Sequence, residues 1–96
     1  MSAATILSEI TANGIILSEA DKSLLTHKFV SARTEADFVN IVRTVAAIAL
    51  ISSTPSSRRS IMLIAINFAK EFVLIRPMPA LSAIANELQT QYIDVV

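Results

Sequence analysis

Residues 61–75 read IMLIAINFAKEFVLI and form the most informative stretch of the chain. At 100° per residue, the polar residues Asn67, Lys70 and Glu71 stay within one strip of a helix, and the remaining circumference is apolar. The wide apolar arc consists of Ile61, Met62, Ile64, Ala65, Ile66, Phe68, Ala69, Phe72, Val73 and Ile75. Proline can begin a helix but cannot continue one. We therefore expect a helix from Pro55 to about Ile75 that packs against several neighbours.

A second stretch, from Glu35 to about Ser52, has an equally wide apolar arc and precedes the first in the chain. Three narrower helices are expected at Ala3–Ala12, at Glu19–Ala32 and from Pro79 towards Tyr92. The chain of 96 residues has one glycine and three prolines, and strand-like alternation is hard to find. The sequence thus predicts an all-α fold, a compact bundle of about five helices in one domain over residues 1–96, with the third and fourth helices central.

Local signals mark where these helices begin and end. Ser18 to Asp21 (SEAD) and Thr34 to Asp37 (TEAD) form a near repeat, which could record a duplication. We favour two helix starts, because the hydroxyl can accept an amide hydrogen bond and the acids suit the positive end of the helix dipole. Gly14 is placed to end the first helix in a left-handed conformation, with Ile15 touching Ile10.

Composition excludes several classes of function. There are eight basic and eight acidic residues, so no overall field attracts nucleic acid or an anionic membrane. The chain has no cysteine and a single histidine, His27, which leaves no pattern for a metal site, and one glycine cannot build a phosphate-binding loop. We expect no enzymatic activity, no cofactor, no metal and no membrane span. The N-terminus lacks the features of a signal peptide, and we expect a cytoplasmic protein.

The junction TPSSRRS, residues 54–60, is the main local anomaly. Thr54 and Pro55 suit a helix start, but Arg58 and Arg59 then oppose the helix dipole by roughly 0.3–1 kcal/mol each. A bound anion would remove the conflict, and the residues offered for it are Ser56, Ser57, Arg58, Arg59 and Ser60. The alternative is that the arginines only keep the end of an apolar helix solvated.

Two functions from different classes remain. The leading hypothesis is a non-enzymatic interaction module, an adaptor, inhibitor or assembly protein that works through the apolar faces of the third and fourth helices. Self-association into a homo-oligomer is the favoured mode, and a different protein partner is the alternative. Its expected interface is Val42, Val45, Ala49, Met62, Ile66 and Val73. The alternative is a nucleic-acid or phosphate-binding regulator with a basic face of Arg43, Arg58, Arg59 and Lys70. A helical hairpin that inserts part-way into a membrane is disfavoured, because no lysine-rich polar face accompanies the apolar runs.

Overall fold

Five α-helices and one π-helical turn make up the described part of the chain, residues 3–51 and 54–94 of a computed structural model. They are α1 (Ala3–Ala12), α2 (Glu19–Ser31), α3 (Glu35–Leu50), α4 (Pro55–Ile75), α5 (Pro79–Leu88) and η1 (Gln89–Ile93). No strand occurs in these residues, and the prediction of an all-α bundle is confirmed.

The helix limits follow the sequence signals closely. α1 and α4 have the predicted bounds, and α2 ends one residue early because Ala32 is extended. α3 ends at Leu50, and the predicted end at Ser52 lies outside the described residues. The last helix changes from α to π geometry at Gln89, which the sequence pattern did not indicate.

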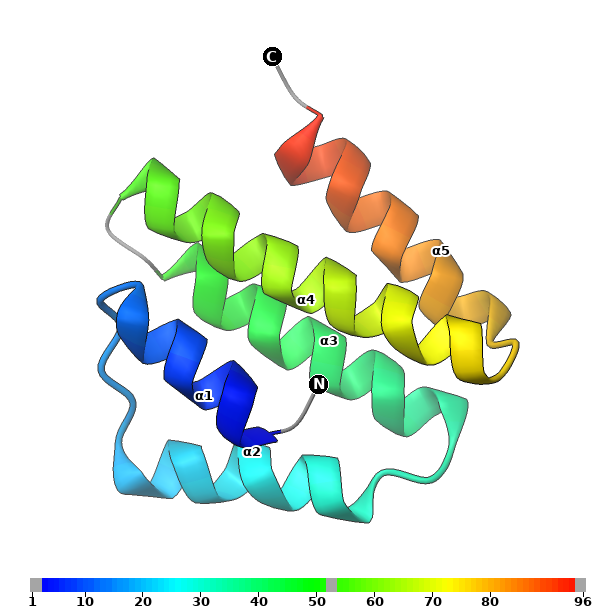
Figure 1. The fold of residues 1–96 in the computed structure, drawn as a ribbon, viewed down its shortest axis with the longest axis horizontal. Coiled ribbons are helices and arrows are strands. Elements are labelled where there is room, and N and C mark those ends of the chain that lie inside the picture. The colour runs from blue at the N-terminus through cyan, green and yellow to red at the C-terminus, as the bar shows by residue number, and fades with distance from the viewer. Residues whose placement is uncertain (1–2, 52–53, 95–96) are drawn as a thin grey trace.

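The central element of the bundle is the antiparallel pair α3 and α4, which make the most extensive contact in the molecule. Figure 1 shows α5 on one side of this pair and α1 and α2 on the other. The Cα atoms span 35 × 34 × 16 Å, so the bundle is a slab about two helices deep. Its accessible surface is 5553 Å². Roughly 5,400 Å² is expected for a compact monomer of this mass, so the chain is about as compact as a typical monomer of its size.

An aromatic cluster ties three helices together. It contains all four phenylalanines of the chain, Phe29 from α2, Phe38 from α3, and Phe68 and Phe72 from α4. Neighbouring ring centroids lie 4.7–6.5 Å apart, in tilted and edge-on arrangements. These are the distances at which aromatic rings attract each other beyond simple burial. The cluster therefore fixes how α2 and the start of α3 pack on the C-terminal half of α4.

The end of α1 is a Schellman motif, as the sequence predicted. Gly14 has φ +86°, a conformation that residues with a Cβ atom rarely adopt. The amide of Gly14 donates to the carbonyl of Thr11 at 3.0 Å, and that of Ile15 donates to the carbonyl of Ile10 at 3.4 Å. Ile10 and Ile15 are both buried in the core, so the chain turns without exposing the apolar side chain that follows the glycine.

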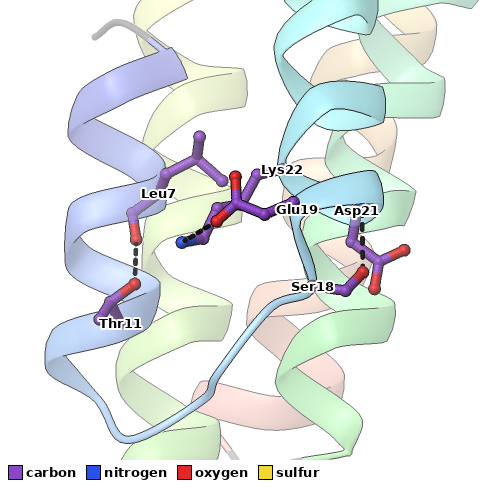
Figure 2. A network of polar contacts seen from close by, with 6 residues as sticks. All are labelled: Leu7, Thr11, Ser18, Glu19, Asp21 and Lys22. Carbon is purple, nitrogen blue, oxygen red and sulfur yellow. Dashed lines mark hydrogen bonds and ion pairs between the residues drawn. The ribbon is translucent and has the colours of Figure 1, made fainter.

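Both members of the near repeat are helix caps. The Ser18 hydroxyl accepts the amide of Asp21 at 3.1 Å, and Figure 2 shows this bond beside the exposed ion pair of Lys22 with Glu19. Thr34 forms a full capping box, because its hydroxyl accepts the Asp37 amide and the Asp37 carboxylate accepts the Thr34 amide. The backbone N–H groups of Thr34 and then Arg33 lower the pKa of Asp37 from its ordinary value.

One helix start is capped from another helix. The N-cap position of α5 is Met78, whose side chain makes no capping hydrogen bond. A carboxylate oxygen of Glu35, the first residue of α3, accepts the backbone amide of Ala80 at 3.0 Å instead. The negative charge also suits the positive end of α5. The start of α5 is thereby fixed against the start of α3.

Candidate protein-interaction surface

The expected interface residues lie largely inside the protein. Val42, Val45, Ala49, Met62 and Ile66 are buried in the core that α3 and α4 share with the other helices, and only Val73 is partly exposed. The apolar arcs of α3 and α4 are wide because these two helices pack against each other and against other helices of the same chain. The expectation that these five side chains present an outer apolar face is therefore corrected, since none of them is available to a partner in this packing.

Part of the segment 54–60 is explained by helix capping at the start of α4. The Thr54 hydroxyl accepts the amide of Ser57 at 3.2 Å. The guanidinium of Arg59 donates to the carbonyl of Ile93 at 2.9 Å, at the end of η1. A cation stabilises the negative C-terminal end of a helix. The charge that opposes the dipole of α4 therefore supports the last turn of the chain.

The other residues proposed for an anion stay near this point. Arg58 and Arg59 line an open depression of about 290 Å³ together with Pro55, Gln91 and Tyr92. Ser56 is exposed, and Ser57 and Ser60 are half-buried on the first two turns of α4. The structure brings two guanidinium groups to one depression, and that of Arg59 is held by a carbonyl of the protein itself.

The basic face proposed for nucleic acid is divided by α5. Lys70 donates to the side-chain oxygen of Gln89 at 2.7 Å and lines a depression with Ser82 and Asn86. Arg43 lines a different depression with Ile84 and Glu87, on the other flank of α5. Arg43 and Lys70 are therefore separated by a helix, and Arg59 is directed at the end of η1. Arg43 and Lys70 therefore do not share one depression or one flank of α5.

A different surface emerges at the C-terminal end of α4. Leu74 is 88 % exposed and Ile75 is 76 % exposed, although they are consecutive large aliphatic residues. We call the group Val73, Leu74 and Ile75, with the depressions on its two sides, the α4 terminal surface. Exposed aliphatic side chains mark a binding surface where they continue into further apolar surface, which the depressions beside this pair provide.

Helix geometry explains both exposures. Leu74 falls on the strip of α4 that holds Asn67, Lys70 and Glu71, so it points away from the core. Sequence reasoning missed it, although an apolar residue within a polar strip was the available signal. Ile75 falls on the apolar arc and was expected in the core. It is exposed because it is the last residue of α4, where the covering helices no longer reach.

Two depressions flank these side chains. One, of about 350 Å³, lies between α4 and α5 and is lined by Val73, Leu74 and Ala85, among others. The second, of about 270 Å³, lies between the end of α4 and the α2–α3 connection. Its lining includes Ile75 and the rings of Phe38 and Phe72, so the aromatic cluster forms part of its wall. The exposed aliphatic pair thus continues into apolar hollows on both sides.

The charged groups that line the depressions are cations. Lys70 lines the first, and Arg33 and Arg76 line the second, whereas no acidic residue among those that the structure describes lines either. Their hydrogen bonds go to neutral acceptors: Lys70 to Gln89, Arg76 to the carbonyl of Arg33 at 3.3 Å, and Arg33 to the carbonyls of Val30 and Ala32.

Three carboxylates lie close to this surface. Glu35 accepts a backbone amide of α5, and Asp37 accepts the amides of Arg33 and Thr34. Glu71 is exposed on α4, one turn before Ile75. Glu35 and Asp37 are therefore committed to the first turns of helices, and the described residues that line the depressions carry positive charge.

The remaining exposed aliphatic side chains are distributed over other elements. Ile16 lies between α1 and α2, Leu24 and Val30 lie on α2, and Leu50 and Ile51 lie at the end of α3. Ile16 is 94 % exposed, and it lines none of the depressions described above. Ile16 is therefore a matched control for Leu74 in experiments that test this surface.

Comparison with known proteins adds no assignment to this geometry. No family model matches the chain, and neither a curated protein nor a solved structure is significantly similar to it. Within residues 3–51 and 54–94, no helix has the length and apolarity needed to cross a bilayer. The same residues contain no cluster of three or more side chains suited to holding a metal ion.

Proposed function

We propose that this protein is a non-enzymatic, cytoplasmic interaction module that binds a protein partner on the α4 terminal surface. The observation that carries the proposal is the exposed pair Leu74 and Ile75, which lies between two apolar depressions. The buried core is formed by other side chains of this chain, and Leu74 and Ile75 are not part of it. Their exposure is therefore not caused by a missing piece of the core.

Energetics support an association role for such a pair. Removing apolar surface from water contributes about 25 cal/mol per Å². Leaving Leu74 and Ile75 in water forgoes this contribution, and a partner that covers them recovers it. Interfaces of this kind depend on a few central side chains in apolar surroundings, with polar groups at the rim. The cations around the depressions supply such a rim.

Site-directed photo-cross-linking in native cells tests the proposal. A photo-reactive phenylalanine analogue is introduced at position 74 in one variant and at position 16 in another, because both sites are highly exposed. We expect a discrete adduct with another protein from position 74 and none from position 16. The double variant Leu74→Glu, Ile75→Glu is expected to weaken binding of the captured partner at least tenfold, whereas Ile16→Glu leaves it unchanged.

The same experiment contains the outcomes that overturn the proposal. Equal adducts from positions 74 and 16 would show that the surface is not selective. Absence of any adduct from position 74 would show that nothing covers it. An adduct of twice the mass of the chain would identify a second copy as the partner, which keeps the interaction module but contradicts the inference below.

A further inference from the structure

We infer that the α4 terminal surface binds an acidic amphipathic helix of another protein. The inference rests on the proposed function and adds the chemistry of the partner. Its basis is the combination of the aliphatic pair Leu74 and Ile75 with depressions whose charged lining groups, within residues 3–51 and 54–94, are Lys70, Arg33 and Arg76.

The cations at the α4 terminal surface favour a partner with negative charge beside its apolar residues. A segment with apolar residues on one face and carboxylates beside them places its apolar side chains over Leu74 and Ile75, and its negative groups near Lys70 and Arg76. Opposite charges across an interface accelerate encounter and select the partner. A basic segment with the same apolar face would bring like charges together at the rim of both depressions, which costs affinity.

The same charges disfavour a second copy of this chain. In a symmetric dimer through this surface, the identical patch from each copy would face the other. Lys70, Arg33 and Arg76 of the two copies would then surround one apolar contact. Glu35 and Asp37, which lie close to this surface, are committed to backbone amides. Self-association at this surface is therefore opposed by its own cations.

The surrounding secondary structure favours a helical partner. The described residues contain no strand, so no sheet edge is available to pair with an extended peptide. The larger depression instead follows the groove between two helices, α4 and α5. An amphipathic helix binds such a groove through apolar side chains spaced three or four residues apart.

Selection from a displayed library tests the inference directly. The probe is a library of 16-residue helical peptides with leucine fixed on one face and Asp, Glu, Lys, Arg, Ser and Gln randomised on the other positions. We expect the wild-type protein to enrich Asp and Glu beside the leucines. The variant Lys70→Glu, Arg76→Glu is expected to reverse this preference and enrich Lys and Arg.

The control variant is Lys22→Glu, Arg43→Glu, which changes the net charge by the same amount away from the surface. It is expected to enrich the same acidic peptides as the wild type, with affinities within about threefold. Circular dichroism confirms that each variant is folded. Affinity for the selected acidic peptides is expected to fall as salt is raised from low to physiological concentration, because screening weakens exposed charge pairs.

The outcomes separate this inference from the proposed function. Enrichment without a charge preference, but lost in Leu74→Glu, Ile75→Glu, overturns the acidic partner and leaves the interaction surface in place. Enrichment that survives Leu74→Glu, Ile75→Glu, or no enrichment at all, overturns the helical acidic partner, and an adduct from position 74 in the cross-linking experiment then still supports the interaction surface by itself. A preference that the control variant reverses as fully as the surface variant does would show that overall charge, and not this surface, selects the peptides.

Discussion

The two ends of α4 differ in how the molecule uses them. At the N-terminal end, Thr54 caps the helix and Arg59 binds the carbonyl of Ile93, so a polar segment is absorbed into the protein's own structure. At the C-terminal end, Leu74 and Ile75 are apolar and remain in water. A conspicuous polar motif is thus accounted for largely by folding, whereas two ordinary aliphatic residues have no role in the core. Our proposal for the function therefore rests on uncovered aliphatic side chains that continue into apolar depressions, and not on the polar motif.

The largest expected difference compares two isoleucines of α4. Ile61 is fully buried and Ile75 is 76 % exposed, although both lie on the apolar arc. Ile61→Ala is expected to lower the free energy of unfolding by about 2–5 kcal/mol, because it leaves a cavity. Ile75→Ala is expected to change it by no more than about 0.5 kcal/mol. Urea unfolding measures both values.

The comparison is sharpened by repeating the Ile75→Ala measurement over a range of protein concentrations. A cost that equals that of Ile61→Ala, and that grows with concentration, would mean that another copy of the chain covers the end of α4. Ile75 would then be buried in the assembly as Ile61 is buried in the chain, which contradicts a C-terminal end of α4 that remains in water.

A smaller effect is expected at the N-terminal cap. Thr54→Ala removes the hydroxyl that accepts the Ser57 amide, and such caps contribute about 0.5–2 kcal/mol to stability. The melting temperature is expected to fall by about 4–8 °C for each 1 kcal/mol lost. Thr54→Ser keeps the acceptor and serves as the control. A Thr54→Ser variant as unstable as Thr54→Ala would assign the loss to the methyl group instead.

Arg59 is expected to contribute less, because its guanidinium is exposed to solvent. Arg59→Gln removes the charge from the end of η1, and a loss of roughly 0.3–1 kcal/mol is typical of such helix-end cations. Calorimetry in the presence and absence of inorganic phosphate distinguishes a role in the fold, through the carbonyl of Ile93, from a role in binding an anion. We expect phosphate to leave the melting temperature of the wild type unchanged. Stabilisation by phosphate that disappears in Arg59→Gln would instead establish an anion site.

The smallest effect is expected at the capping box of Thr34 and Asp37, at the start of α3. The pKa of the Asp37 carboxyl is lowered in the folded protein, mainly by the backbone amides of Thr34 and Arg33. A lowered pKa stabilises the folded state above the unfolded pKa, and this contribution is lost as the pH falls through the folded pKa. Asp37→Asn is therefore expected to destabilise the protein at neutral pH, and the difference from wild type should vanish well below about pH 4. A difference that persists at the lowest pH would contradict this origin.

The local structure could be predicted from the sequence because its causes are local. The helix limits, the Schellman turn at Gly14 and the capping box at Thr34 each depend on residues within one or two turns of each other. The wide apolar arcs also predicted that α3 and α4 are central. An apolar arc does not say which neighbour covers it, however, and Val42 and Met62 were assigned to an outer face for that reason.

The interaction surface could be predicted only in part, because it depends on contacts between distant segments. The partner of Arg59 is 34 residues away along the chain, so no local pattern shows that its charge is used within the fold. Ile75 is exposed because the covering helices stop short of it, which is a property of tertiary packing. Leu74 is the exception, since an aliphatic residue within the polar strip of α4 was visible in the sequence.

The cap that Glu35 provides to α5 has a consequence for the order of folding. The ten residues of α5 and the five of η1 that continue it only reach the roughly 12–15 residues below which isolated helices are marginal in water. The carboxylate that accepts the Ala80 amide lies 45 residues earlier in the chain, at the start of α3. We therefore expect α5 to consolidate only after α3 and α4 have paired. Stopped-flow kinetics of Glu35→Gln should show faster unfolding with an unchanged folding rate, whereas slower folding would place this contact in the transition state.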